Sequence, residues 1–116
     1  MQKINTYITE KLKIDKHVKA QIIIESKEQL IDIIAERVKK SRTIDLNDLD
    51  ISRLDDISYL FRSVETLTYE INKIRSIKVS SWNVSNVVNM SRSFSSLSNA
   101  VFDDLSLWDV SKVKDM

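Results

Sequence analysis

The chain has 116 residues, enough for one domain with a modest hydrophobic core and too few for two independent globular units. Its 18 basic and 17 acidic residues leave a net charge of +1, so composition gives no strong preference for nucleic acid or for a membrane surface. The absence of cysteine excludes disulfides, thiolate nucleophiles and cysteine-ligated zinc. Glycine and proline are also absent, so asparagine, aspartate and serine are expected to make the turns.

No apolar run is long enough to cross a membrane, which takes about 18 residues, and residues 1–7 contain no unbroken apolar stretch. We therefore expect neither a membrane span nor a signal peptide. These absences predict a cytoplasmic protein, located in the host cytoplasm if a phage encodes it.

The first part of the chain alternates between helical and extended patterns. Apolar residues at helical spacing predict a short amphipathic helix over residues 4–13, and the β-branched run at 20–25 predicts a strand. Ser26 and Gln29 form a capping box, in which each side chain bonds the backbone amide of the other residue, so a second helix should begin at Lys27. One apolar stripe on that helix comprises Leu30, Ile31, Ile34 and Val38.

Beyond Arg42 the useful signal is self-similarity. Three segments align: residues 49–57 (LDISRLDDI), 82–90 (WNVSNVVNM) and 108–116 (WDVSKVKDM), offset by 33 and then 26 residues. One such unit cannot bury its own apolar face, whereas stacked units share a continuous core. The pattern therefore predicts a repeat array.

Stacking of the copies makes specific predictions about side chains. Trp82 and Trp108 should lie in neighbouring coils with Leu49 beneath them, and Phe61 and Phe94 should form a second internal stack.

The serines at the fourth repeat position should hydrogen-bond the turn backbone through their hydroxyl groups; they are Ser52, Ser85 and Ser111. The longer first interval places an insertion within residues 62–78, whose apolar pattern predicts an additional strand or a cover.

Residues 81–94 (SWNVSNVVNMSRSF) and 105–116 (LSLWDVSKVKDM) resemble the W-[DN]-V-S-x-V-x-[DN]-M repeat of the BspA-like, or DUF285, family. The segments 26–30 (SKEQL) and 46–52 (LNDLDIS) are similar to the leader that precedes such repeats. The resemblance implies a leucine-rich-repeat-like fold and a role in protein binding, since several members are surface proteins or lipoproteins associated with adhesion. This chain departs from them because it has no visible export signal and no cysteine to carry a lipid.

Together these patterns predict an α+β fold forming a single cooperative domain. Residues 1–45 would form an N-terminal helical cap, and residues 46–116 would form a short right-handed solenoid of about two and a half repeats, each with a short strand and a helical turn. The last copy reaches Met116 in the middle of a repeat, so its coil should present unpaired backbone and apolar surface. A second copy of the chain or another protein would cover that end.

Catalytic and metal-binding patterns are weak. His17 is the only histidine and belongs to no hydrolase motif. Residues 45–50 resemble the start of a calcium loop but lack its glycine at the sixth position, and Asp56 stands where a glutamate is usual at the twelfth, so turn residues are the better interpretation. Acidic pairs such as Asp55 with Asp56 could do acid and base work only in an apolar pocket, which nothing in the sequence indicates. We expect no catalytic residue, no metal site, no cofactor and no enzymatic activity.

Variable repeat positions should form an exposed ladder that contacts a partner: Arg53, Asp56, Asn86, Asn89, Lys112 and Asp115. A possible basic patch on and after the second helix comprises Arg37, Lys39, Lys40 and Arg42.

These residues predict a non-enzymatic protein–protein interaction module of bacterial or phage origin. A narrower hypothesis is a small phage-encoded inhibitor that binds a host defence complex. The alternatives are nucleic-acid binding through the basic clusters, which is not favoured because the net charge is close to zero, and a structural or assembly component that forms homo-oligomers.

Overall fold

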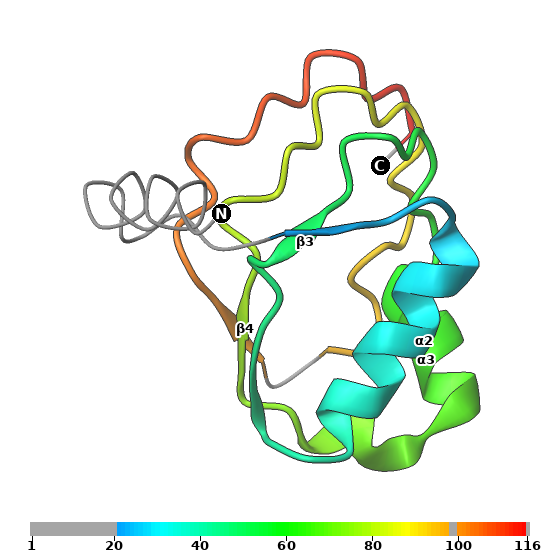
Figure 1. Ribbon diagram of the computed structural model, residues 1–116, viewed down its shortest axis with the longest axis vertical. Helices are drawn as coiled ribbons and strands as arrows, with labels where there is room; N and C mark the ends of the chain where they lie inside the picture. The colour runs from blue at the N-terminus through cyan, green and yellow to red at the C-terminus, as the bar shows by residue number, and fades with distance from the viewer. Residues whose placement is uncertain (1–20, 98–99, 116) are drawn as a thin grey trace, which may run out of the picture.

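The computed structural model describes residues 21–97 and 100–115 as a small α+β domain with two α-helices and short parallel strands (Figure 1). The predicted helix over residues 4–13 and His17 lie outside the described residues. In chain order the elements are β1 (Ile22–Ile23), α2 (Lys27–Val38), β2 (Thr43–Asp45), β3 (Leu49–Asp50), α3 (Leu60–Leu67), the 3₁₀ helix η1 (Tyr69–Lys73), β4 (Ser76–Lys78) and β5 (Val101–Phe102).

Helix α2 begins at Lys27, as predicted. Ser26 has extended backbone angles, and its hydroxyl oxygen accepts a hydrogen bond from the Gln29 amide at 3.1 Å. The other half of the predicted capping box is wrong, because the Gln29 side-chain oxygen accepts from the Glu25 amide at 2.7 Å and not from Ser26. The buried face of the helix comprises Leu30, Ile34, Ala35 and Val38, with Ile31 partly buried beside it.

The repeats lie side by side because their backbones pair in parallel. Strands β2, β4 and β5 form one sheet, in which Ile44 is opposite Ile77 and Ile77 is opposite Phe102. Strand β1 pairs in parallel with β3 and so covers the other side of the first repeat. In Figure 1 the chain after β3, after β4 and after β5 runs in three nested arcs, while α2 and α3 pack against each other at the opposite end.

Asparagine and aspartate side chains make the turns, but not in the way predicted for the serines. The side-chain oxygens of Asp50, Asn83 and Asp109 each accept the backbone amide of the serine two residues later, at 2.9–3.0 Å. The serine contributes its amide in each copy, and the hydroxyl groups of Ser52 and Ser111 also interact with the carboxylates of Asp50 and Asp109. At Asn83 the serine hydroxyl donates to the same oxygen at 2.6 Å. These turns replace the missing glycine and proline.

The insertion in the first interval is a helical cover and not an additional strand. Helix α3 and η1 occupy it, with Ile71 and Ile74 buried and Tyr69 78% exposed. Strand β4, which follows the insertion, is the central strand of the sheet that it forms with β2 and β5.

The aromatic stacks are confirmed. The rings of Trp82 and Trp108 are nearly parallel, 6° apart in angle with centroids separated by 6.4 Å, and Phe61 stacks on Phe94 at 5.6 Å. Trp82 donates its indole N–H to the Leu46 carbonyl at 2.8 Å, and Trp108 donates to Val79 at 3.0 Å. Each tryptophan thus bonds the same repeat position of the preceding copy.

One position breaks the regular offset. An offset of 26 residues would place Asp103 opposite Ile77, but the sheet pairs Phe102 there instead. The Asp103 carboxylate then accepts the backbone amides of Val79 at 3.0 Å and Ser80 at 3.2 Å. Burial raises the pKa of Asp103, but these hydrogen bonds outweigh it and hold the pKa below its ordinary value.

One cluster of buried apolar side chains extends from Ile24, the residue after β1, to Met90 in the second repeat. Strand β2, which precedes residue 46, contributes Ile44 to the same cluster. The division of the chain at residue 45 stays a prediction.

Candidate functional site

The predicted ladder residues lie in two adjacent columns, one residue from each repeat. In the first column the Asn86 amide group donates to the Ser52 carbonyl at 2.8 Å, and the Lys112 ammonium donates to the Asn86 side-chain oxygen at 3.3 Å. Arg53 is exposed and makes a two-pronged contact with the Glu25 carboxylate at 2.9 and 3.0 Å. The column therefore joins the repeats to one another as well as facing solvent.

In the second column Asp56, Asn89 and Asp115 are linked by parallel bridges. The Asp56 carboxylate accepts the Ser58 amide at 2.8 Å, and Asn89 accepts the Ser91 amide at 3.0 Å. The hydrogen bonds from Ser58, and then the charge of Lys27, hold the pKa of Asp56 below its ordinary value. The structure thus brings all six predicted residues together. The side chains of Asn86 and Lys112 join neighbouring repeats, whereas those of Asp56 and Asn89 hold turns within their own repeats.

The predicted basic patch is not a single cluster. Arg37 turns toward the Asp48 carboxylate, with its two terminal nitrogens at 2.7 and 2.9 Å from the two oxygens, and it also donates to the Asp45 carbonyl. Its pKa is raised, first by the hydrogen bond to Asp48 and against the effect of burial. Lys39 pairs with Glu36 at 3.5 Å. Lys40 is exposed at the end of the helix and Arg42 lies further on, before β2.

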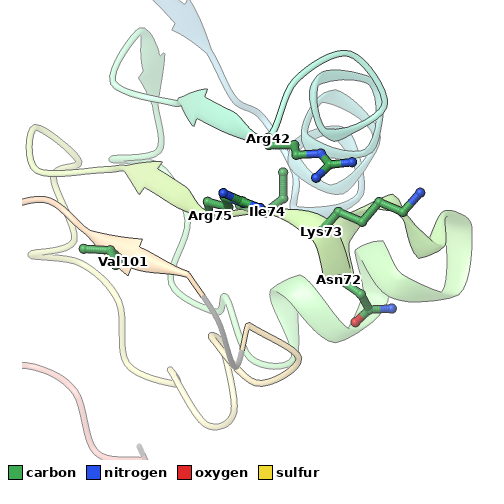
Figure 2. Close-up of a pocket in the computed structure, with 6 residues that line it drawn as sticks. All are labelled: Arg42, Asn72, Lys73, Ile74, Arg75 and Val101. Carbon is green, nitrogen blue, oxygen red and sulfur yellow. The ribbon is translucent and has the colours of Figure 1, made fainter.

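Arg42 instead joins Lys73 and Arg75 around a shallow cleft of about 480 Å³ (Figure 2). The cleft lies where the strands begin, since the Arg75 amide donates to the Arg42 carbonyl and the Val101 amide donates to the Arg75 carbonyl. Within the described residues Arg42 and Arg75 have no ion pair, whereas Lys73 contacts Glu70 at 3.6 Å. In Figure 2 the three charged ends are spread along the rim and do not converge on one point.

The sequence contained a signal for this grouping. Arg42 and Arg75 are 33 residues apart, which is the offset of the first two repeats, so they occupy one repeat position. The predicted patch grouped Arg42 with basic residues that are close to it in the sequence. Repeats instead bring together residues that are one period apart, and so Arg42 lies beside Arg75.

The last copy exposes apolar residues that its predecessors bury. Val110 is 38% exposed, whereas Val84 and Ile51 at the same repeat position are 1% and 0% exposed. Leu107 and Val101 of the same copy are 90% and 67% exposed, at positions where the second copy has the polar residues Ser81 and Ser76. Each repeat covers the one before it, and no described residue covers the last.

Within residues 21–97 and 100–115, no three histidine, cysteine, aspartate or glutamate side chains are grouped so that they could hold a metal ion. No helix in that part of the chain is long and apolar enough to cross a membrane.

The two helices and the parallel pairing of short strands define a small α+β domain whose sequence contains repeats. Residues 34–116 match the family described as "Mycoplasma protein of unknown function, DUF285", and the chain belongs to that family. The resemblance drawn from the tryptophan-containing repeats is thereby confirmed. No curated protein and no solved structure matches the chain.

Proposed function

We propose that this protein is a non-enzymatic protein–protein interaction module, built as a short solenoid of about two and a half coils with an N-terminal helical cap. Parallel pairing in register, stacked tryptophans and indole hydrogen bonds between equivalent positions support the solenoid. The packing of α2 against α3 supports a cap at one end.

The observation that carries the interaction role is the loss of burial in the last coil. The valine side chain at position 110 is 38% exposed, against 1% at position 84 of the preceding coil. Because the two residues are chemically identical and occupy equivalent positions, the difference in exposure shows how much burial a neighbouring coil gives to this position. An exposed apolar surface of this kind is typical of a protein-binding site.

Polar residues border this apolar surface in the way that rims border protein interfaces. Lys112 and Asp115 are exposed on the same coil and continue the two ladder columns. A partner that packs on Leu107 and Val110 would meet these two charges at its edge, where they would set orientation and specificity more than affinity.

Solution mass tests the proposal, with two matched variants. Val110→Asp and Val88→Asp change the same residue type at the same exposure of 38%, on the last coil and on the second coil respectively. We expect the unmodified protein to form a dimer in a concentration series by light scattering, and only Val110→Asp to abolish it. Equal effects of both variants, or none, would contradict a binding role for the last coil.

If the protein stays monomeric throughout that series, self-association is refuted, and the proposed partner is a different protein. A photo-crosslinking residue at position 110, compared with one at position 88, then tests for that partner in cells. Crosslinks to one protein from position 110 alone would support the proposal, and equal labelling from both positions would contradict it.

The narrower hypothesis is that a phage encodes the chain and that it blocks a host defence complex in the host cytoplasm. Its small size and repeat surface are compatible with such an inhibitor. Expression of the protein in a host with an active defence system should restore phage plating, and Val110→Asp should remove that effect while Val88→Asp retains it. Unchanged plating across a panel of defence systems would contradict the hypothesis.

A second candidate function is nucleic-acid binding, favoured by the grouping of Arg42, Lys73 and Arg75 around one cleft. If all three contact phosphate, the logarithm of the binding constant should fall with the logarithm of salt concentration with a slope of about −2 to −3. The double variant Arg42→Ala/Arg75→Ala should reduce that slope, whereas Lys78→Ala, outside the cleft, should not. A binding constant that is independent of salt would exclude this function.

A further inference from the structure

The cleft at the start of the strands contains two arginines that neighbouring coils place side by side. Arg42 immediately precedes β2 and Arg75 immediately precedes β4, and these strands pair in parallel from their first residues. The Arg75 amide donates to the Arg42 carbonyl at 2.8 Å, so the backbone holds the pair at the spacing of neighbouring strands, about 4.8 Å. Both side chains line the cleft (Figure 2).

This pair of arginines is electrostatically unfavourable in the protein by itself. Two like charges at adjacent positions of neighbouring strands repel each other. No carboxylate among residues 21–97 and 100–115 forms an ion pair with either side chain, whereas Arg37 is paired with Asp48 at 2.7 Å. Charges brought together without a counter-ion break a rule of stable folds, and such departures are typical of functional sites. Here the repulsion would be relieved by a bound anion.

The arrangement of the charges indicates an extended ligand and not a single small anion. In Figure 2 the charged ends of Arg42, Lys73 and Arg75 are spread along the rim of the cleft, so an anion bound at one point cannot contact all three. A chain with repeated negative charges can contact them in succession. Alternate residues of an extended peptide are about 6.5 Å apart on one face, a spacing that two long arginine side chains can reach.

An exposed tyrosine continues this surface beyond the cleft. Tyr69 is the first residue of η1 and is 78% exposed. Residues three apart in a 3₁₀ helix lie on the same side of it, so Tyr69 shares a face with Asn72, which lines the cleft. The rise of about 2 Å per residue places the two residues about 6 Å apart along the helix axis. Ile71 of η1 and the next residue after η1, Ile74, are buried and fix the orientation of this face.

The composition of the surface favours a protein partner over nucleic acid. Its three basic residues can contact about three phosphates, whereas the strong salt-dependent binding of DNA-binding proteins involves about 6–10 such contacts. One of the three, Lys73, is already paired with Glu70 at 3.6 Å. Tyrosine and arginine are, in contrast, among the residue types that contribute most to affinity in protein interfaces.

We propose that the surface formed by Arg42, Asn72, Arg75 and Tyr69, here called the acidic-segment site, binds an acidic segment of a partner protein. Two carboxylates at alternate positions of the segment pair with Arg42 and Arg75, because the planar guanidinium group matches both oxygens of a carboxylate. An apolar side chain of the segment packs on the Tyr69 ring. The site belongs to the first two coils and does not include Val110, so it adds a second surface to the interaction function proposed above.

A short synthetic peptide tests the proposal on the full chain. The peptide alternates glutamate with serine and carries a phenylalanine at one end, and its control has glutamine in place of every glutamate. Titration of the glutamate peptide into ¹⁵N-labelled protein at low ionic strength, where exposed charges are least screened, should shift the amide resonances of Tyr69, Asn72 and Arg75 in a saturable way. The glutamine peptide should give no saturable shift. Equal binding of the two peptides, or no saturable shift with either, would overturn the proposal.

Two variants at opposite ends of β4 provide a matched comparison. Arg75→Gln and Lys78→Gln each remove one positive charge, and only Arg75 lines the cleft. Arg75→Gln should weaken peptide binding about three- to fivefold, the upper range for one exposed ion pair, and Lys78→Gln less than about twofold. Equal losses would show that the peptide responds only to net charge and would overturn the site.

The tyrosine is tested separately, because its contact is apolar. Tyr69→Ala should weaken binding of the glutamate peptide at least about threefold, and replacing the peptide phenylalanine by alanine should have a similar effect. Combining the two changes should then weaken binding little more than either change alone. Unchanged affinity in Tyr69→Ala would overturn the placement of an apolar side chain on this ring.

The melting temperature of the free protein gives a second readout. Because Arg75 lies beside Arg42 without a counter-ion, Arg75→Gln should leave the melting temperature unchanged or raise it. A decrease clearly larger than that of Lys78→Gln would show that the Arg75 side chain stabilises the fold, and it would overturn the argument from unpaired charge.

Two further outcomes separate this inference from the functions proposed above. A single-stranded oligothymidine that binds more tightly than the glutamate peptide, with the same dependence on Arg75, would overturn the protein partner and support nucleic acid. Val110→Asp should leave peptide binding unchanged. Loss of peptide binding in Val110→Asp but not in Arg75→Gln would overturn the cleft as the site and support the last coil. The comparison of Val110→Asp with Val88→Asp in solution mass judges the interaction function independently.

Discussion

Trp82 and Trp108 occupy one repeat position but differ in burial, so their removal should have unequal effects on stability. Trp82 is 3% exposed, stacks on Trp108 and donates to the Leu46 carbonyl at 2.8 Å. Trp82→Ala should lower the free energy of unfolding by about 3–5 kcal/mol, the usual cost of deleting a buried aromatic side chain.

Trp108→Ala removes the same stack and an equivalent hydrogen bond, to Val79 at 3.0 Å. Trp108 is only partly buried, so less apolar area is lost and a smaller cavity remains. We expect a cost of about 1–2.5 kcal/mol, roughly half that of Trp82→Ala. Because the lost pair contacts are shared, the difference between the variants reports burial by the next coil.

Urea unfolding followed by far-ultraviolet circular dichroism measures both values, since this signal does not depend on the tryptophan that is removed. A domain of this size has a total stability of about 5–15 kcal/mol, so Trp82→Ala should remain measurable, and an unchanged urea dependence would support comparison of the two. Trp82→Phe serves as a control that retains a ring and should cost about 1–2 kcal/mol. A Trp108→Ala cost equal to or above that of Trp82→Ala would refute the stacking order.

Substitutions at three further residues test the turns and the buried polar contacts. Asp56 has a lowered pKa in the folded protein, so its contribution to stability is present above the unfolded pKa of about 3.9 and is lost as pH falls through the folded value. Asp56→Asn should keep the turn, as Asn89 does, and should reduce the fall in melting temperature between about pH 5 and pH 2; an unchanged acid profile would contradict this. Ser93→Ala should cost about 1–2 kcal/mol in urea unfolding because the Ile57 carbonyl loses its buried donor, and a neutral result would show that this carbonyl has another partner. Tyr59→Asn should cost less than about 0.5 kcal/mol, since asparagine tolerates the positive φ of 58°, whereas Tyr59→Val should cost at least about 1 kcal/mol more by the same measurement; equal costs would contradict backbone strain at this residue.

The local features that were predicted well depend on short stretches of chain. Ser26 caps α2 because its hydroxyl oxygen reaches an amide three residues away, which is a contact that sequence spacing alone determines. The second half of the capping box failed because the Gln29 side chain also reaches the Ile23 carbonyl and the Glu25 amide, which the entry of β1 places beside it. The position of the strand before the helix therefore determines that the Gln29 side chain bonds the Glu25 amide and not the Ser26 amide.

The ladder residues show a similar division. Their membership in two columns follows from the repeat period, and Asp56, Asn89 and Asp115 are indeed neighbours. The hydrogen bonds that these side chains make could not be predicted from the period, because the local geometry determines whether a side chain contacts solvent or a neighbouring repeat. The grouping of Arg42 with Arg75 could have been predicted from the period of 33 residues, but the period was applied only to the repeat motif and not to the charged residues outside it.

The sequence by itself determined the family, the copies that stack, the aromatic residues that meet and the start of α2, because each follows from a repeat period or from contacts within one helical turn. Tertiary structure decided the rest. It made the insertion a cover formed by α3 and η1, and it shifted β5 by one residue so that Phe102 and not Asp103 pairs with Ile77. These outcomes depend on which backbone groups remain to be paired once the coils have stacked, and that is a property of the assembled fold and not of any one segment.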